Sequence, residues 1–229
     1  MVRGEQPPPS TPAPLSAKEP KARRNKLRKE EIVAEATRLF AERGYEGTSM
    51  GDLAERVGLR KASLFHHFES KDALYATVLS ELMVAVQVSI VAAVAAEGSY
   101  VDRLDALTAS MTDLLGNQPH AARLLMREAM DWGPVMQDRL AAQIQEVLEA
   151  AVVFAEGGQR EGVFDARLEP RHLVISLIGI YFIPFVIDRT VERFVMMSPY
   201  EASFVEARRA AVLAQTRALT LARSAAATQ

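Results

Sequence analysis

Cysteine is absent from the 229-residue sequence. This absence excludes a disulfide framework, a thiol nucleophile and a zinc site built on thiolates. Runs with the two-residue period of strands are absent as well, whereas apolar residues recur at helical spacing along most of the chain. We therefore predict an all-α fold. Because 49% of the residues are hydrophobic, a sizeable core can form.

The sequence also lacks a clear membrane-spanning or secretory segment. The longest uncharged apolar run, 173–187, has 15 residues, which is fewer than the ~20 that span a bilayer, and it contains Pro184. Residues 1–14 lack the apolar core of a secretory signal. We expect a cytoplasmic protein without a membrane partner, in which 173–187 forms a buried helix.

Signatures of catalysis are missing too. The chain has no glycine-rich phosphate loop, no nucleophile–base signature and no carboxylates paired at Glu-x-x-His spacing. The adjacent His66 and His67 could suggest a metal site, but neighbouring helical residues do not share a face and no other ligand cluster lies near them. We predict no enzyme activity, no metal and no cofactor. A helical-bundle enzyme is the distant alternative.

Charge is unevenly distributed although the net charge is only −2. Residues 1–80 carry 14 Lys and Arg against 11 Asp and Glu, whereas residues 81–229 carry 13 against 18. A basic N-terminal region on an acidic body favours a polyanionic partner for that region alone, and a solubilising charge run is the alternative. The densest basic run consists of Lys21, Arg23, Arg24, Lys26, Arg28 and Lys29.

A first helix is predicted from about Leu27 to Arg43, because its apolar residues fall on one face. It ends at Gly44, since glycine accepts the left-handed backbone that follows a helix C-terminus. Residues 1–24 precede it and hold six of the eleven prolines. We expect them to be a disordered basic and proline-rich arm.

Residues 48–74 carry a helix-turn-helix pattern. Ser49 and Asp52 are spaced as a capping box that opens the second helix, and Gly58 permits a tight turn after it. A short third helix, 62–68, can then lie in the major groove of DNA with its N-terminal residues at the base edges.

This segment resembles the DNA-binding domain of tetracycline-repressor-type (TetR family) transcription regulators. The resemblance implies a homodimer that binds double-stranded DNA, with a DNA-binding domain at 25–72 and a ligand-binding and dimerisation domain at 73–229. It covers about residues 27–75 and is carried by Gly44-Tyr45, Thr48-Ser49-Met50, Asp52-Leu53-Ala54, Val57-Gly58-Leu59, Leu64-Phe65-His66-His67-Phe68 and Ser70-Lys71-Asp72-Ala73-Leu74.

The resemblance also assigns DNA-binding roles. A hydroxyl at the start of the second helix, from Thr48 or Ser49, would contact phosphate, and Lys71 would contact another phosphate. The basic run at 21–29 either reaches the DNA, as N-terminal arms do, or is simply disordered. The positions that read DNA fall on Arg60, Lys61, Ala62, Ser63, Phe65, His66 and His67.

Three positions depart from the family pattern. Gly51 stands where a basic residue is frequent, and Phe65 and His67 stand where tyrosine is common. Phe65 lacks a hydroxyl for phosphate, although the imidazole of His67 can still donate a hydrogen bond. These departures predict a weaker grip on phosphate than is usual in the family.

Further helices are expected in the C-terminal half. Ser70 caps a fourth helix that runs to about Ala96, and Gly157 with Gly158 is expected to end the helix that begins near Leu140. Others are expected over about 101–117 and 119–132. The last two helices are predicted to begin at Pro170 and at Pro199, the second within a Ser198–Glu201 capping box.

The final helix carries small residues at every fourth position: Ala210, Ala214, Ala218 and Ala222. Such a stripe lets another helix approach closely. In the resembled family, the last two helices of two subunits form a four-helix dimer interface, and these segments suit that role. Completion of a monomer core is the alternative. The two-fold axis would space the DNA-binding domains by roughly 34–36 Å, which suits a palindromic operator.

The resemblance places an effector pocket in the C-terminal domain. Met and aromatic side chains adapt to apolar guests, and Arg127 and Glu128 could fix a polar group. For the apolar residues plain core packing is the alternative, and for Arg127 a surface ion-pair row with Arg123 and Asp131. The candidate lining residues are Met111, Leu115, Met126, Arg127, Met130, Trp132, Phe154, Tyr181, Phe182 and Phe185.

Together these features predict a ligand-responsive transcription regulator. We expect a repressor that a small, largely apolar effector releases from a palindromic operator. An activator or a co-repressor-dependent regulator of the same fold is the alternative.

Overall fold

The computed structural model describes residues 21–131, 133, 137 and 140–222, and it confirms the all-α fold. The only β-type pairing among these residues is an isolated antiparallel bridge between Phe164 and Leu221. The helices are α1 (Lys21–Arg43), α2 (Met50–Arg56), α3 (Lys61–His67), α4 (Lys71–Ala95), α5 (Tyr100–Asn117), α6 (Ala121–Asp131), α7 (Ala141–Arg160), α8 (Pro170–Val186), α9 (Asp188–Val195) and α10 (Ala202–Thr220).

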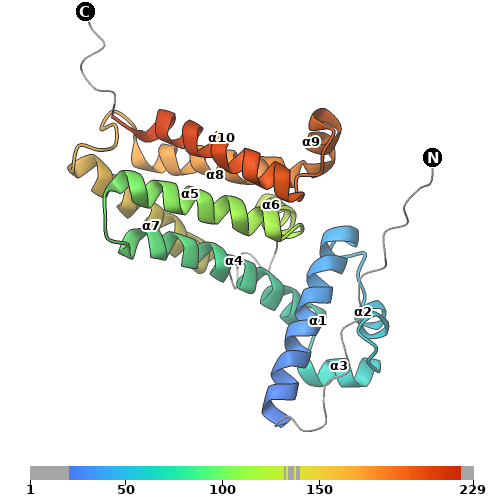
Figure 1. Ribbon diagram of the computed structural model, residues 1–229. Helices are drawn as coiled ribbons and strands as arrows, with labels where there is room; N and C mark the ends of the chain where they lie inside the picture. The colour runs from blue at the N-terminus through green and yellow to red at the C-terminus, as the bar shows by residue number, and fades with distance from the viewer. Residues whose placement is uncertain (1–20, 132, 134–136, 138–139, 223–229) are drawn as a thin grey trace, which may run out of the picture.

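Helices α1, α2 and α3 form a small head at one end of the molecule, and α4 leads from the head into a larger helical body (Figure 1). In the body, α5 packs between α4 and α10, while α7 packs against α4 and α8. Helix α6 lies at the junction, where it contacts α1, α4 and α8. The body therefore reaches the head through α4 and α6.

Helix α4 is, by length and composition, the one described single helix that could cross a membrane. The helices α8 and α9, bent by 76°, would add a second span only if the pair is counted as one. In this fold α4 is the central helix, since α1, α5, α6 and α7 all pack against it. Its apolar character thus has an explanation within the folded chain.

The first helix begins at Lys21 rather than at Leu27, so the basic run is helical and part of the predicted arm is not. Lys and Arg are good helix formers, and two contacts hold the segment. Arg28 Nη2 donates to the carbonyl oxygen of Val57 at 2.6 Å, and Lys29 lies over the Phe68 ring. Residues 1–20 of the predicted arm lie outside the described residues.

Local capping residues set the helix ends in the head as predicted. Ser49 and Asp52 form a complete capping box at α2, and Ser70 Oγ accepts from the Ala73 N–H at 3.0 Å at the start of α4. Gly44 and Gly58 have φ angles of +76° and +64°. Because side chains with a Cβ rarely adopt such angles, glycine is required in both turns.

The segment between α8 and α10 differs from the prediction, although α8 itself begins at Pro170 as predicted. The short helix α9 intervenes, and α10 begins at Ala202 rather than at Pro199. The Ser198 N–H donates to the Glu201 carboxylate, but Ser198 Oγ accepts from Tyr200 N rather than from Glu201 N, so the box is incomplete and 198–201 is a turn. Tyr200 pins this turn to α8 by donating to the carbonyl oxygen of Phe185.

The prediction that Gly157 and Gly158 end a helix was wrong. Both are buried inside α7, which continues to Arg160. A Cβ at Gly158 would lie 2.6 Å from Cγ of Phe164 and closer still to its Cδ2 and Cε2 atoms. These glycines therefore allow aromatic rings to approach the α7 backbone, which is a packing role that the sequence does not display.

The substitution Gly158→Ala is expected to lower the free energy of unfolding by about 1–3 kcal/mol, because overpacking displaces the Phe164 ring. Chemical denaturation of the purified variant measures this loss. Gly51→Ala is the matched control, since its nearest neighbour, Ser49 Oγ, is 3.4 Å from the added Cβ. That variant should be neutral or gain up to ~1 kcal/mol from helix propensity. Equal effects at the two positions would contradict the packing role.

Candidate nucleic-acid interface and ligand cavity

The turn between α2 and α3 is fixed by backbone hydrogen bonds. The Leu59 N–H donates to the carbonyl oxygen of Ala54 at 2.8 Å, and the Gly58 N–H donates to that of Glu55 at 3.1 Å. Ala54 and Leu64 are buried where the two helices meet. This packing holds α3 in place and leaves its outer face to solvent.

The residues that were predicted to read DNA lie on this outer face. Arg60, Lys61, Ala62, Phe65 and His66 are exposed, while Ser63 and His67 are half-buried. Among the described residues, neither Arg60 nor Lys61 has an ion-pair partner. By contrast, Arg56 is paired with Glu35 at 2.5 Å. The two cations at the start of α3 are therefore available to an external anion.

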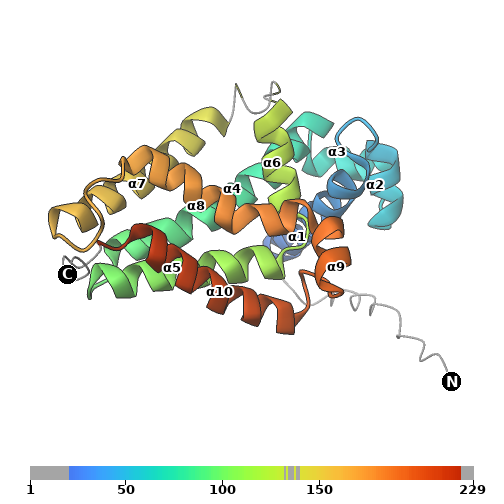
Figure 2. The same ribbon diagram turned by 90° about the horizontal axis from the view of Figure 1, so that it is seen from above.

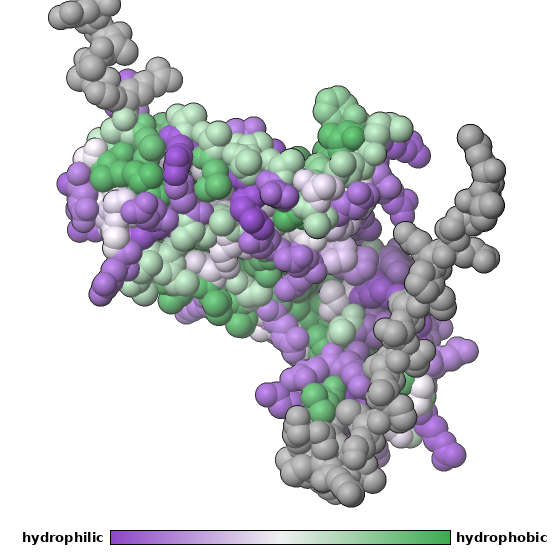
Figure 3. All heavy atoms as spheres, viewed as in Figure 1, coloured by the Kyte–Doolittle hydropathy of each residue, from purple (hydrophilic) through white to green (hydrophobic). Residues whose placement is uncertain are grey.

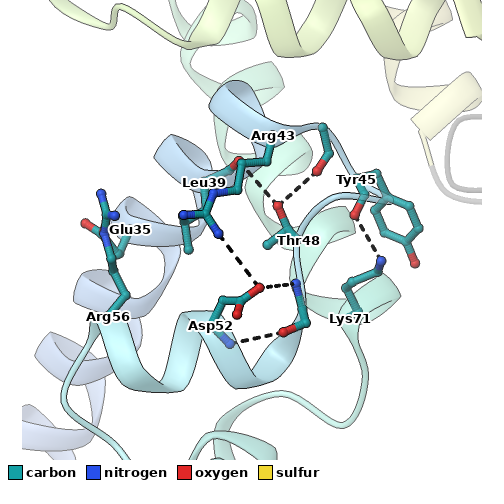
Figure 4. Close-up of polar contacts among 10 residues, drawn as sticks. Glu35, Leu39, Arg43, Tyr45, Thr48, Asp52, Arg56 and Lys71 are labelled. Carbon is teal, nitrogen blue, oxygen red and sulfur yellow. Dashed lines mark hydrogen bonds and ion pairs between the residues drawn. The ribbon is translucent and has the colours of Figure 1, made fainter.

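Thr48 does not occupy the position predicted for it. Its side chain is only 2% exposed, and its hydroxyl lies 2.9 Å from the carbonyl oxygen of Gly44 and 3.3 Å from that of Leu39 (Figure 4). A hydroxyl that is buried and satisfied in this way cannot reach a phosphate. Ser49 is exposed at the N-terminus of α2, so the phosphate role predicted for one of the pair is left to Ser49.

Lys71 is half-buried and engaged with the turn after α1. Its ammonium donates to the carbonyl oxygen of Tyr45 at 2.9 Å and lies 4.0 Å from the centroid of the Tyr45 ring (Figure 4). The Tyr45 hydroxyl in turn donates to the Asp72 carboxylate. An ammonium has three donors, so Lys71 can hold Tyr45 and still offer a donor at the surface.

The basic N-terminal part of α1 lies beside the helix-turn-helix pair (Figure 1). Arg28 binds the end of α2 through Val57 and pairs with Glu31 at 2.7 Å. The side chain of Lys26 is 79% exposed, and its distance of 3.9 Å from Glu30 makes only a loose pair. The basic run is thus a helical extension of the head.

A cavity of about 310 Å³ lies in the body, enclosed mainly by α4, α5, α6, α7 and α8. Five predicted residues line it: Met111, Met126, Phe154, Tyr181 and Phe182. The prediction missed the side of α4 that faces the cavity, which includes Leu79, Met83 and Val86. Helix α4 is apolar nearly all round, so its sequence period does not mark one face.

Other predicted lining residues lie elsewhere. Leu115 and Phe185 are buried in the core away from the cavity, and Met130 is 70% exposed. Arg127 points to the head, where its Nη1 atom is 3.2 Å from the position that a Cβ of Gly44 would take. Trp132 lies outside the described residues.

Helix α6 contacts both the cavity and the head. Leu125, Met126 and Ala129 line the cavity. Glu128, only 7% exposed, accepts a hydrogen bond from the Tyr75 hydroxyl at 3.0 Å. Burial, with the neighbouring Glu128 carboxylate, raises the pKa of Tyr75, so the phenol stays a neutral donor.

The ring of Tyr75 continues this contact into the head. Its centroid lies 4.8 Å from that of Phe40 in α1 and 4.9 Å from that of Tyr45. The alternative ion-pair row of Arg127 with Arg123 and Asp131 is not formed among the described residues, where Arg123 pairs instead with Asp188 at the start of α9. Helix α6 is therefore held between the cavity wall, the head and the α8–α9 corner.

A helix-turn-helix head on a helical body with an apolar cavity defines a DNA-binding transcription regulator with a ligand-binding domain. Residues 32–78 match the family model of bacterial regulatory proteins of the tetR family, and residues 101–214 match that of the tetracyclin repressor-like C-terminal domain. The chain belongs to the TetR family of transcriptional regulators. The proteins of this family that it matches are regulators rather than enzymes.

Individual relatives agree with this assignment. The HTH-type transcriptional regulator RutR of Escherichia coli O157:H7 is 23% identical over 150 residues, which cover 66% of this chain and 70% of RutR. The ketosteroid transcriptional regulator KstR2 of Mycobacterium tuberculosis shares the fold with a TM-score of 0.70 at 17% identity, over 86% and 96% of the two chains. AibR, which was solved with isovaleryl coenzyme A and operator DNA, shares the fold with a TM-score of 0.64 at 19% identity. That match covers 82% of this chain and 97% of AibR.

Proposed function

We propose that the protein is a cytoplasmic homodimeric repressor that leaves a palindromic operator when a small, largely apolar effector enters the cavity. The observation that carries this proposal is the double contact of α6, which forms part of the cavity wall and is hydrogen-bonded through Glu128 to Tyr75 of α4, whose ring packs against Phe40 in the head. A guest that displaces α6 changes the position of the head. It can shift the equilibrium only by its differential affinity for the two arrangements.

The dimer is supported by an uncovered apolar face on α8 and α10. Ile175 and Ile183 are 63% and 45% exposed, and Gly179 between them meets nothing within 4 Å on that side. The alanines predicted to form a stripe on α10 are all exposed. The two helices lie side by side in the view from above (Figure 2). Exposed apolar surface of this kind commonly marks an interface between proteins.

The repressor role is supported by the description of the matched C-terminal family as tetracyclin repressor-like. That AibR was solved together with both operator DNA and an acyl coenzyme A is consistent with a regulator of this fold that responds to a small molecule. An activator or a co-repressor-dependent regulator would differ in one measurable way, because effector would then strengthen operator binding.

The test is a titration of the full chain onto the intergenic DNA upstream of its own gene, at several salt concentrations and with random DNA of equal length. Affinity should fall steeply with salt, and the upstream DNA should bind more tightly than random DNA. Equal affinity for the upstream DNA and the random DNA would contradict the proposed function. Tighter binding in the presence of effector would retain the regulator but reverse the repressor mechanism.

Lys61→Ala and Lys71→Ala are expected to weaken DNA binding in different ways. Lys61 is exposed at the start of α3, so its loss should weaken the specific site by about 1–3 kcal/mol and reduce the preference over random DNA. Lys71 lies outside α3 and holds Tyr45, so its loss should weaken all sequences about equally. Fluorescence anisotropy on both DNAs measures the two effects. A changed sequence preference in Lys71→Ala would reverse the assigned roles.

A further inference from the structure

The wall of the cavity is almost free of polar groups. Among the described residues that line it, none is charged, and only Tyr181 and Thr220 carry an oxygen in the side chain. An ion that enters such a site loses its hydration without gaining a partner. The chemistry of the wall therefore favours a neutral guest.

The hydroxyl of Tyr181 already has a partner. It lies 3.0 Å from Oγ1 of Thr108, which is itself 3.4 Å from Oγ1 of Thr216. All three residues are buried, and burial raises the pKa of Tyr181 to about 12. This small network joins α5, α8 and α10 and is satisfied within the chain.

Thr220 differs from the other buried threonines. It is 1% exposed, lines the cavity, and its Oγ1 has no hydrogen-bond partner among the described residues. By contrast, Thr112 donates to the carbonyl oxygen of Thr108 at 2.8 Å. A buried hydroxyl without a partner is unfavourable. Rotation about χ1 exchanges Oγ1 with Cγ2, so the hydroxyl can turn toward a guest.

The backbone fixes Thr220 in this place. Its carbonyl oxygen accepts from the Asp165 N–H at 2.9 Å, and the Ala222 N–H donates to Val163 at 3.0 Å. These bonds tie the end of α10 to the segment after α7, at the end of the body farthest from the head (Figure 1). Helix α6 closes the cavity near the head, so Thr220 and α6 lie at opposite ends.

We propose that the effector is a neutral molecule with a hydrocarbon body and one hydrogen-bonding group, and that the Thr220 hydroxyl binds this group while the body extends toward α6. The proposal rests on the proposed function, in which the cavity receives the effector. A volume of 310 Å³ equals that of about ten liquid waters at ~30 Å³ each. This suits a guest of about ten non-hydrogen atoms, such as a medium-chain alcohol or ketone.

The test compares octan-1-ol, octane and octanoic acid by calorimetric titration of the full chain. Thr220→Val should weaken octan-1-ol about 5- to 10-fold, which corresponds to one hydrogen bond, and should leave octane unchanged or tighter. Thr220→Ser, which keeps the hydroxyl, should restore octan-1-ol binding. Octanoic acid should bind only in its protonated form, so its apparent affinity should fall tenfold for each pH unit above the pKa of the free acid.

Thr112→Val is the matched control, because Thr112 is a buried threonine outside the cavity wall. It should change octan-1-ol and octane equally. The assignment of Thr220 is overturned if Thr220→Val also affects both probes equally, and the neutral guest is overturned if octanoate binds at pH 8 as tightly as octan-1-ol. Failure of all three probes to bind overturns the inference but leaves the DNA titration standing. The probes could also bind in the expected pattern without changing operator affinity. That result would support the Thr220 site but would contradict the proposal that a guest in the cavity releases the operator.

Discussion

The substitution Ala214→Glu is expected to dissociate the proposed dimer and to lower operator affinity at least ~100-fold. Ala214 is exposed in the middle of α10, on the side opposite the buried Val205 and Val212. A carboxylate there would be buried without a partner in a four-helix interface, which is strongly unfavourable. A monomer would then bind one half-site and lose the advantage of linking two heads.

Ala92→Glu is the control for Ala214→Glu. Ala92 is an exposed alanine on α4, which lies on the other side of the body from α10 (Figure 1). The same change of charge there should leave both the dimer and the operator affinity intact. Sedimentation gives the mass in solution, and anisotropy gives the affinity. An Ala214→Glu protein that stays dimeric with unchanged affinity would place the interface elsewhere.

A second exposed apolar feature adjoins the uncovered apolar face of α8 and α10. Phe194 and Met196, at the end of α9, are 87% and 86% exposed, and apolar atoms gather over α9 in the surface view (Figure 3). Met196 has a φ of +55°, which ends α9 in a left-handed conformation. Helix α9 could not be predicted from the sequence, because the break after Ile187 depends on contacts that Asp188 makes with Arg123 and Tyr200.

Apart from the start of α1, which lies at Lys21 rather than at Leu27, the helix ends in the head could be predicted because they depend on neighbouring residues. The Ser49–Asp52 box, the Ser70 cap and the two positive-φ glycines are each complete within a few positions of the chain. Thr48 could not be predicted in the same way. Its hydroxyl lies 2.9 Å from the carbonyl oxygen of Gly44 and 3.3 Å from that of Leu39 in α1, and its burial arises only when α2 packs against α1 in the folded head.

The body shows the same division between local and distant contacts. Gly158 looked like a helix end because glycine often follows one, but its neighbour in space is the Phe164 ring. Met111 and Leu115 lie one turn apart on α5 and have the same character, yet only Met111 reaches the cavity. Periodicity shows that a face is buried, and it does not show where facing helices separate.

Tyr75 of α4 links α6 to the head, since its hydroxyl bonds to Glu128 and its ring packs against Phe40. Tyr75→Phe keeps the ring but removes the phenolic hydroxyl that donates to the buried Glu128 carboxylate. Hydrogen bonds to charged groups contribute about 1.5–3 kcal/mol, so the variant should lose that much unfolding free energy at pH 7. It should also respond less to effector. Saturating octan-1-ol should reduce operator affinity by a smaller factor than in the wild type, within the roughly 5–150-fold range of such couplings.

Tyr181→Phe is the matched control, since Tyr181 is also buried but bonds to a neutral hydroxyl of Thr108. It should cost only about 0.5–1.5 kcal/mol and leave the head contact intact. Both variants are expected to depend on pH in the same direction, because folding raises the pKa of Tyr181 as well, so the comparison rests on the size of the loss at pH 7. The pKa of Tyr75 is raised by folding, so its stabilising effect is complete below pH ~10, where the unfolded phenol is neutral, and declines as pH rises further. The stability gap between wild type and Tyr75→Phe should therefore narrow above pH ~10.

A Tyr75→Phe protein that is destabilised but releases operator normally would contradict the coupling role. It would show that the Tyr75–Glu128 bond supports only the fold, and that the effector moves the head through α4.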